Sequence, residues 1–465
     1  MGDFTIVAGD STGKVSFFNG IHGNLLQVFQ ANKADVLTLC LNEEENKLFC
    51  GGVEPGISQF EKVIAGPGND SFHRDYQKWV PSLPRLLHTH DVKSLCMAGE
   101  FLVSGGVDTN LGLSKYPPKT YITLPHIPKN SVHLAEKAAC LMLQYADYLE
   151  VWKLGDTAVE LEMGVEGGDG EMLPLTKGAK KLLQLKTRND ERVICSAISR
   201  DARWLAYSHT SAIHLYQLSL DEEKPLSVHR VKYLPPGVQP AHHLCFAGSD
   251  RLLVATETGD VQVLEVDSVK PKLLHNFDGC QEAVSHIRAS NCGRYAAVSN
   301  FSRTVIVYDI IEFKKVCAMP QFPQQVAALC FHPRDLELLV VYADNSVVEY
   351  SIAEKGYTSW SRRYAKMRHQ MEPAEHVGTT LNVMYHPSDE KHSQLILHGD
   401  KRVRCIDKTE VQSRKRGGAL HVCDRIHYLV HVAPSAPDWL VIVERTPQSI
   451  AVTLPPTLAV KKFGT

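Results

Sequence analysis

The sequence is short of the features that mark several classes of protein. It has no run of about 18 apolar residues, which a membrane-spanning helix would need, and its start lacks the basic-then-apolar layout of a signal peptide. Its 50 Lys and Arg residues are balanced by 52 Asp and Glu residues, and this argues against a histone-like protein that coats nucleic acid through bulk charge. We therefore expect a soluble, intracellular protein whose contacts with polyanions are local.

Motifs for catalysis, metals and cofactors are also missing. The 12 cysteines form no C-x-x-C pair, and the 22 histidines form no H-E-x-x-H motif. Neither a G-x-S-x-G nucleophile turn nor a G-x-x-x-x-G-K-[ST] phosphate loop occurs. We expect no catalytic residue, no metal, no cofactor and no small-molecule substrate, so the chain is not predicted to be an enzyme.

What the sequence does contain is a repeat. Each unit has a small-residue apolar strand, a second apolar strand, a Gly, Asp or Asn turn, and a third alternating strand. The first apolar residue of the third strand recurs every 40 to 60 residues or so, close to the spacing of WD-type repeats. These positions are Val15, Ile57, Leu111, Leu149, Ile213, Val261, Val305, Val347, Val403 and Ile450.

Turn residues and cysteines recur with the repeat. Turns that accept positive φ are expected at Thr12–Gly13, Pro55–Gly56, Thr258–Asp260 and Asp344–Asn345. A cysteine recurs within the short apolar strands, where we expect buried, reduced thiols with a structural role. These cysteines are Cys40, Cys96, Cys195, Cys245 and Cys330.

Such units stack radially and close into a β-propeller, usually with about seven blades. The Pro-rich stretch 116–128 follows the third copy, so three copies precede it and seven follow. The predicted fold is all-β: residues 119–465 form a complete seven-bladed WD-repeat propeller, and residues 1–118 form the last blades of an incomplete first one. Two insertions, 64–83 and 160–183, are expected to be exposed loops.

Histidines next to turns are predicted to be structural. His332 and His386 both precede proline at the same place in their repeats, which is typical of a side chain that caps a hairpin turn. The pair His90–Asp91 is similar to the strand-entry pair of a WD repeat, where His and Asp side chains tie loops together.

Basic clusters in the last quarter of the chain are the candidate binding sites. Cations interleaved with aromatic rings can bind phosphates and stack on bases, but they can also be solvated loops, with Trp360 anchoring a strand end. Alternation about Val403 would put two of the arginines on one exposed strand face. The candidates for contact with RNA or an acidic partner are Trp360, Arg362, Arg363, Lys366, Arg368, Lys401, Arg402, Arg404, Arg414, Lys415, Arg416, Lys461 and Lys462.

Several collinear segments resemble the cirhin family of nucleolar WD-repeat proteins. They are Gly105–Leu111, Leu149–Gly155, Tyr357–Arg362 and the ending Leu454–Thr465. The resemblance runs the length of the chain. Because that family has two tandem propellers, the resemblance implies that about the first four blades are missing here.

The resemblance also implies a function. It implies a non-catalytic scaffold of the small-subunit processome in the nucleus and nucleolus, needed for transcription and processing of pre-rRNA. Expected partners are other repeat proteins of the transcription-coupled subcomplex, with pre-rRNA and snoRNP nearby. The alternative is a cytoplasmic WD-repeat adaptor that assembles protein complexes without contact to RNA.

Overall fold

The computed structural model describes most of the chain and divides it into two compact units. The first unit comprises Met1–Ile127 and Thr446–Thr465, and the second comprises Pro128–Arg445. The described residues are 4–65, 76–115, 121–125, 131–157, 175–188, 191–220, 226–278, 282–371, 380–387, 391, 393–399, 402–413, 420–423, 426, 428–435, 439–446, 448, 452 and 454.

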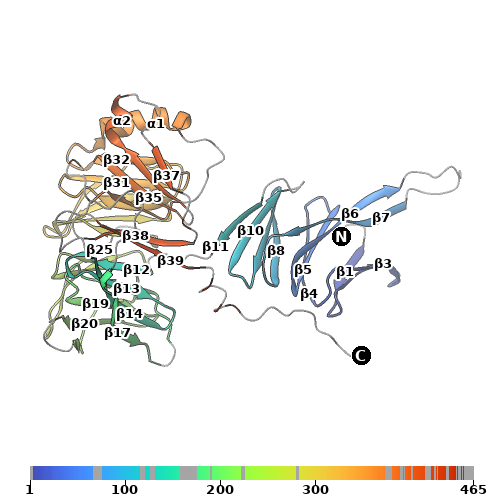
Figure 1. Ribbon diagram of the computed structural model, residues 1–465, viewed down its shortest axis with the longest axis horizontal. Helices are drawn as coiled ribbons and strands as arrows, with labels where there is room; N and C mark the ends of the chain where they lie inside the picture. The colour runs from blue at the N-terminus through green and yellow to red at the C-terminus, as the bar shows by residue number, and fades with distance from the viewer. Residues whose placement is uncertain are drawn as a thin grey trace. The chain divides into compact units, whose positions relative to one another are not determined.

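The first unit consists of antiparallel sheets in chain order, β1–β3, β4–β7 and β8–β11 (Figure 1). The hairpin of β6 and β7 is the longest pair. The strands are β1 (Thr5–Gly9), β2 (Lys14–Asn19), β3 (Leu25–Gln30), β4 (Val36–Leu41), β5 (Lys47–Gly52), β6 (Glu54–Ala65), β7 (Tyr76–Leu86), β8 (Val92–Ala98), β9 (Phe101–Gly106), β10 (Asn110–Lys115) and β11 (Tyr121–Pro125).

The second unit repeats the four-stranded antiparallel sheet. Its sheets are β12-β13-β14-β17, β18–β21, β22–β25, β26–β29, β30–β33 and β34–β37, together with the two-stranded sheets β15–β16 and β38–β39. The strands are β12 (Val132–Ala135), β13 (Cys140–Gln144), β14 (Tyr148–Lys153), β15 (Asp156–Thr157), β16 (Leu175–Lys177), β17 (Lys180–Lys186), β18 (Cys195–Ile198), β19 (Trp204–Ser208), β20 (Ile213–Ser219), β21 (Ser227–Arg230), β22 (Ala241–Ala247), β23 (Arg251–Thr256), β24 (Val261–Glu265), β25 (Lys272–Phe277), β26 (Val284–Ala289), β27 (Tyr295–Asn300), β28 (Val305–Asp309), β29 (Lys314–Ala318), β30 (Val326–Phe331), β31 (Glu337–Tyr342), β32 (Val347–Ser351), β33 (Gly356–Tyr357), β34 (Asn382–Tyr385), β35 (Gln394–His398), β36 (Val403–Asp407), β37 (Leu420–Cys423), β38 (Leu429–Ser435) and β39 (Trp439–Glu444).

Three helical segments accompany these strands: the 3₁₀ turn η1 (Glu136–Ala138) and the helices α1 (Ser359–Met371) and α2 (Lys408–Ser413). Both α-helices lie in the basic clusters of the last quarter of the chain, in the segments 357–368 and 401–416 that we expected to be loops. The prediction of loops there is wrong, because α1 carries an apolar face that packs on β32 and on α2. The all-β prediction still holds for the sheets, which are consistent with blades of a WD-repeat propeller.

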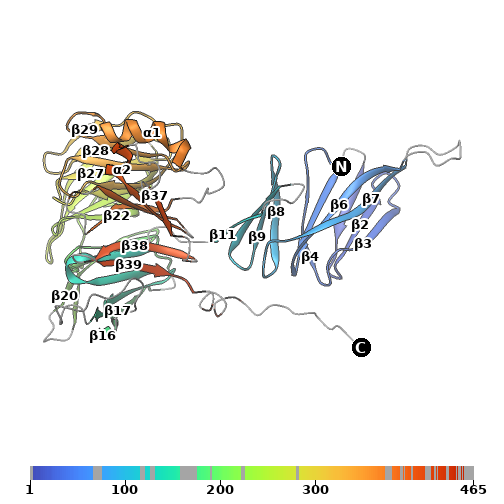
Figure 2. The same cartoon turned by 45° about the horizontal axis from the view of Figure 1, so that its top comes forward.

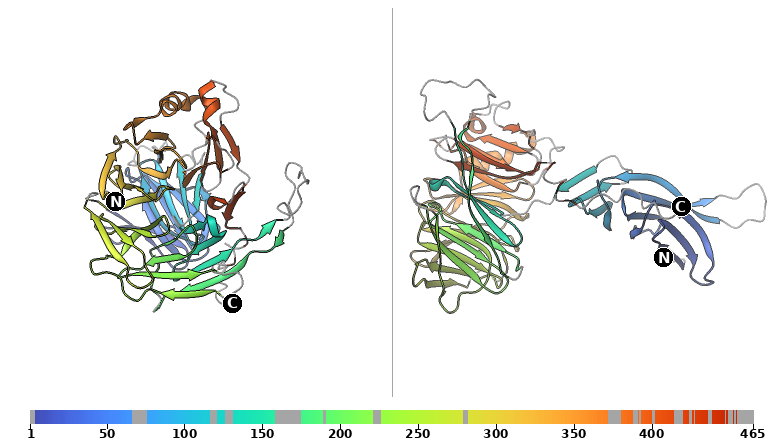
Figure 3. Two further views of the ribbon diagram at one scale, coloured as in Figure 1. Left: turned by 90° about the vertical axis from the view of Figure 1, so that its left-hand side faces the viewer. Right: turned by 60° about the horizontal axis from the view of Figure 1, so that its bottom comes forward.

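The first strands of the sheets in the second unit form a circle of contacts. In order, β12 contacts β18, β18 contacts β22, β22 contacts β26, β26 contacts β30, β30 contacts β34, and β34 contacts β38. Strand β38 also contacts β12, so the last sheet lies beside the first (Figure 2 and the left view of Figure 3). Each sheet therefore has a neighbour on both faces.

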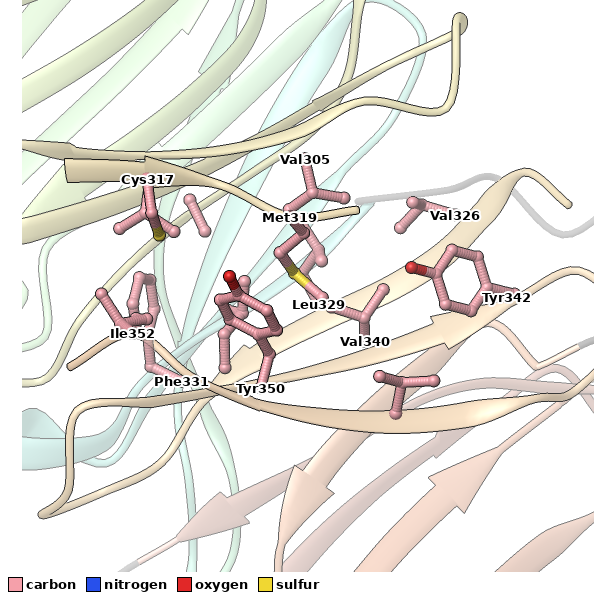
Figure 4. Packing of buried hydrophobic residues seen from close by; sticks show 14 residues of the cluster. Val305, Cys317, Met319, Val326, Leu329, Phe331, Val340, Tyr342, Tyr350 and Ile352 are labelled. Atoms are coloured by element: carbon pink, nitrogen blue, oxygen red, sulfur yellow. The ribbon is translucent and has the colours of Figure 1, made fainter. Parts of the chain in front are cut away.

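Apolar side chains fill the spaces between neighbouring sheets. Between β26–β29 and β30–β33, Val305 and Met319 face Leu329 and Val340, and Tyr350 closes the cluster (Figure 4). All five residues of β28 and all five of β32 are buried. These third strands were predicted to alternate between buried and exposed residues. That prediction is wrong for β28 and β32, because a neighbouring sheet covers each face, and even Asp309 and Glu349 are buried.

The repeat positions agree with the predicted pattern. Each of the marker residues from Val15 to Val403 lies in a strand, while Ile450 falls outside the described residues. Positive φ occurs as expected at Gly13 (84°), Gly259 (90°) and Asn345 (63°). A Cβ on Gly259 would lie 2.3 Å from the carbonyl oxygen of Glu282, so the turn requires glycine.

Three predictions about local structure need correction. Pro55–Gly56 lies inside β6 and forms no turn. Much of the expected loop 64–83 belongs to the β6–β7 hairpin, and the end of the second insertion pairs as β16 and β17. Strand β11 pairs with β10, so the compact units divide after Ile127 and not after residue 118.

Hydrogen bonds identify which histidines are structural. In the first unit His88, not His90, ties the loops together: its Nδ1 lies 3.0 Å from Asp108 Oδ1 and its Nε2 lies 2.8 Å from Ser104 Oγ. In the second unit the N–H groups of Arg334 and Asp335 donate to Nδ1 of His332. The predicted capping role of His332 is therefore confirmed.

The cysteines are less buried than predicted. All of those in the described residues are free thiols, but Cys96 is exposed and Cys40, Cys245 and Cys330 are only half-buried. Cys195 is buried as expected, and burial raises its pKa to about 12. Cys195 and Cys245 both line a cavity of the second unit.

Candidate functional site

Helix α1 carries the first basic cluster. It begins just after β33, the short outer strand of the sheet β30–β33. Only two residues of β33 pair with β32, and the chain then turns into the helix. Thr358 caps the helix, because its Oγ1 accepts a hydrogen bond from the N–H of Ser361 at 3.3 Å. The hydroxyl of Thr358 donates in turn to Glu349 Oε2 at 2.9 Å, which fixes the start of the helix to β32.

A buried ion pair holds the helix against the sheet. Glu349 is 2% exposed and forms a salt bridge with Lys408 Nζ, while Tyr385 Oη donates to its Oε1 at 3.0 Å. The ammonium group of Lys408 also lies over the rings of Trp360 and Tyr385, at 5.5 and 5.6 Å from their centroids. Burial and Glu349 raise the pKa of Tyr385 well above its usual value.

The two faces of α1 differ in character. Trp360 and Tyr364 are buried, and their rings stack with centroids 5.1 Å apart. Arg362, Arg363 and Lys366 are exposed. Because 362 and 366 are one turn apart and 363 lies beside them, these three cations share the outer face of the helix.

The buried position of Trp360 decides between its two predicted roles. Its 2% exposure leaves no ring face on which a base could stack, and its contacts are those of an anchor. Arg368 lies in α1, but its side chain is outside the described residues, as are Lys401, Arg414, Lys415, Arg416, Lys461 and Lys462.

Arg402 and Arg404 are both half-buried, so the expectation that they share an exposed strand face is wrong. Arg404 donates to Asn345 Oδ1 at 3.1 Å and to Thr380 Oγ1. The hydroxyl of Thr380 donates to the same oxygen of Asn345 at 2.7 Å. Arg404 therefore joins β36 to the neighbouring turn, and its charge is directed into the protein.

A second polar site lies at the centre of the second unit. The strands β12, β18, β22, β26, β34 and β38 line a cavity of about 260 Å³. Its wall includes Arg200, Arg288, Glu136 and His431. Burial, His398, His133 and Arg288 lower the pKa of His431 to about 3, so this imidazole is neutral at physiological pH. Sequence reasoning missed this site, although an arginine among recurring cysteines was a signal for it.

Two features are absent from the described part of the structure. No group of three or more His, Cys, Asp or Glu side chains there is arranged to hold a metal ion. In the same residues, no helix has both the length and the apolar character that crossing a membrane requires.

Comparisons with known proteins identify relatives, although no family model matches the chain. The mouse and human proteins called U3 small nucleolar RNA-associated protein 4 homolog are each 30% identical to it, over 100% of this chain and 70% of theirs. The Saccharomyces cerevisiae U3 small nucleolar RNA-associated protein 4 is 24% identical, over 77% of this chain and 47% of its own.

Among solved structures, a chain of the mitotic checkpoint complex covers 68% of this chain and 87% of its own, with a TM-score of 0.47 and 10% identity. A similarity at this level supports no conclusion about the fold or the function of this chain. The two mammalian relatives match from end to end of this chain, as the cirhin resemblance predicted. The chain belongs to the family of U3 small nucleolar RNA-associated protein 4.

Proposed function

We propose that this protein is a non-catalytic scaffold of the nucleolar small-subunit processome, and that it acts in the transcription and processing of pre-rRNA during ribosome biogenesis. The observation that carries the proposal is its 30% identity, over the whole chain, to mammalian proteins named for association with U3 small nucleolar RNA. Its partners in this role are other repeat proteins of the transcription-coupled subcomplex, with pre-rRNA and snoRNP nearby.

The proposed architecture suits a scaffold. In this proposal the second unit, Pro128–Arg445, is a complete seven-bladed WD-repeat propeller, and the sheets that precede it are the last blades of a first one. The closed circle of strand contacts from β12 to β38 supports the first part of this proposal. A propeller presents two faces and a rim at fixed geometry, so it can hold several partners without catalysing a reaction.

The exposed face of α1 is the proposed contact with RNA. Three cations, Arg362, Arg363 and Lys366, stand together on a helix whose other side is fixed by Glu349 and Lys408. A rigid helix loses little conformational entropy when it binds, and phosphate oxygens are the matching acceptors for guanidinium groups. Because the net charge of the chain is −2, binding must depend on such a local cluster.

A triple charge reversal tests this surface. We expect Arg362→Glu, Arg363→Glu and Lys366→Glu together to release the protein from pre-ribosomal particles in gradient sedimentation at moderate salt. The matched control is Lys180→Glu, Lys270→Glu and Lys355→Glu, which makes the same charge change at other exposed lysines. Equal co-sedimentation of the two variants would rule out the α1 face as the contact.

Salt dependence separates RNA from an acidic protein partner. Each phosphate contact contributes about 0.7 to the slope of log K against log salt for single-stranded RNA, so loss of three contacts should lower the slope by about 2. Ribonuclease treatment should release the unsubstituted protein if RNA is the partner. Fluorescence imaging tests the scaffold role itself, since a cytoplasmic adaptor would stay outside the nucleolus.

A further inference from the structure

The wall of the cavity at the centre of the second unit carries two arginine side chains, Arg200 and Arg288. The cavity is lined by the first strands of successive sheets, and a cysteine recurs at one position of such first strands in both units. Cys40 in β4, Cys96 in β8, Cys245 in β22 and Cys330 in β30 are each the fifth residue of their strand. Each of these strands also has a register shift after its first residue.

Strand β26 has the same register shift, but its fifth residue is Arg288. It pairs with Ala297 as Cys245 pairs with Leu253 and as Cys330 pairs with Leu339. The position that holds a small thiol in the neighbouring strands therefore holds a guanidinium group here. A small residue packs equally well at this position, so packing alone does not require an arginine.

Arg288 influences the pKa of several neighbouring groups. It acts on the thiols of Cys245 and Cys330 and on the imidazole of His431, and Arg200 acts on the same two thiols. Both arginines line this cavity together with Cys245 and His431. The side chain of Arg288 donates to the carbonyl oxygen of Ile287 at 3.2 Å, and that of Arg200 donates to Asn291.

Neither guanidinium group is neutralised in the described part of the chain. No ion pair is formed there by Arg200 or by Arg288, and Glu136 is the acidic group on the cavity wall. Both arginines are half-buried, so their guanidinium groups keep contact with solvent and can accept an anion as a partner. Two unpaired arginines that line one cavity are the arrangement of an anion site.

We propose that this cavity binds a phosphate group of a phosphate monoester, with Arg288 and Arg200 as its hydrogen-bond donors. A volume of about 260 Å³ admits a phosphate and part of the attached alcohol. The monoester is either a small metabolite or the 5′ end of an RNA chain, since both present the same dianionic group. Arg288 lies in β26 and Arg200 lies in the turn after β18, so the site does not include α1 and does not depend on the proposed RNA contact.

Titration calorimetry of the full chain tests the proposal, with inorganic phosphate as the first probe. We expect saturable binding that weakens about tenfold or more in Arg288→Cys, because a hydrogen bond to a charged group is worth that much in affinity. This variant carries the residue that the neighbouring strands hold, so it should fold, as its thermal unfolding will show. Arg200→Ala is the second variant, and Arg203→Ala, whose side chain is 73% exposed, is the control.

Uridine 5′-monophosphate and an oligouridine with or without a 5′-phosphate distinguish the two sources. Binding of the mononucleotide alone assigns a small ester, and binding of the 5′-phosphorylated chain in addition assigns the RNA end; both results support the site. Absence of phosphate binding, or equal binding by Arg288→Cys and Arg203→Ala, would overturn it. The triple variant of α1 should bind phosphate normally, so failure of one proposal leaves the other intact.

Discussion

The sheets β1–β3 and β26–β29 have the same antiparallel order but are covered differently. In β26–β29 a neighbouring sheet covers each face, and every residue of β28 is buried. In β1–β3 only one face is covered, where Val15 and Phe17 pack on β5 and β6. The other face leaves Ile6 57% exposed and Leu25 54% exposed. A single repeat therefore obtains its stability from its neighbours, and the predictions below test this dependence.

The largest effect is expected where a charge is buried by the neighbouring sheet. Lys408→Met leaves the carboxylate of Glu349 without its cation at 2% exposure, and such a loss costs about 3 kcal/mol or more in unfolding free energy. Urea unfolding followed by the ¹⁹F signal of fluorotryptophan at Trp360 would measure it.

The control for this prediction is Lys314→Met. Its ammonium group is 60% exposed and pairs with Glu312 at the surface, so we expect a change below about 1 kcal/mol. Similar losses for the two variants would contradict the idea that burial by a neighbour makes the ion pair important.

A pair of apolar truncations compares the two kinds of sheet directly. Leu339→Ala removes a side chain that is fully buried, and we expect a loss of about 2–5 kcal/mol. Ile6→Ala removes one that is 57% exposed, and here we expect a change within about 0.5 kcal/mol. Hydrogen exchange of peptides from β30–β32 and from β1–β3 would report the two losses separately. A large loss for Ile6→Ala would mean that its face is covered in solution.

The smallest effect is a dependence on pH in the first unit. Burial alone would raise the pKa of Asp108, but hydrogen bonds from His88 and from the N–H groups of Thr89 and Asn110 lower it to about 2. The unfolded chain has the ordinary value of 3.8, so it binds more protons between these values. The network contributes about 2 kcal/mol above pH 4, and this is lost as the pH falls toward 2.

Trp79 lies in the first unit and can report this transition by ¹⁹F NMR. Asp108→Asn should be less stable at pH 6 and should lose less stability than the unsubstituted protein between pH 6 and pH 3. An equal pH dependence in both proteins would show that another carboxylate is responsible.

The repeat could be predicted from sequence because its strands are short, apolar and separated by turn residues. Local patterns of that kind survive in a single chain, and positions such as Val305 and Val347 fell in strands. Long-range pairing was harder to predict. His88 and His90 lie two residues apart, so the sequence does not show which of them joins the loops. The distance of 3.0 Å from His88 Nδ1 to Asp108 Oδ1 shows that it is His88.

The candidate site was predictable only in part, for the same reason. The cations Arg362, Arg363 and Lys366 were visible as a cluster, but the helix that presents them depends on Glu349 and Lys408, which lie 59 residues apart. Arg404 was expected to be exposed, yet its partner Asn345 is just as distant along the chain. Arg288 was not predicted as a site residue, because a repeat pattern is defined by the residues that recur. Arg288 stands at a position where β22 and β30 have a cysteine.

The contact between β12 and β38 has a consequence for synthesis of the chain. About 300 residues separate Val132–Ala135 from Leu429–Ser435. At roughly 5–20 residues per second, the ribosome takes about 15–60 s to supply the later strand after the earlier one has emerged. During that interval β38 is not yet available to cover the side of β12 that it contacts in the folded protein. A nascent chain that stops before residue 429 therefore keeps this surface exposed, where it can associate with other chains.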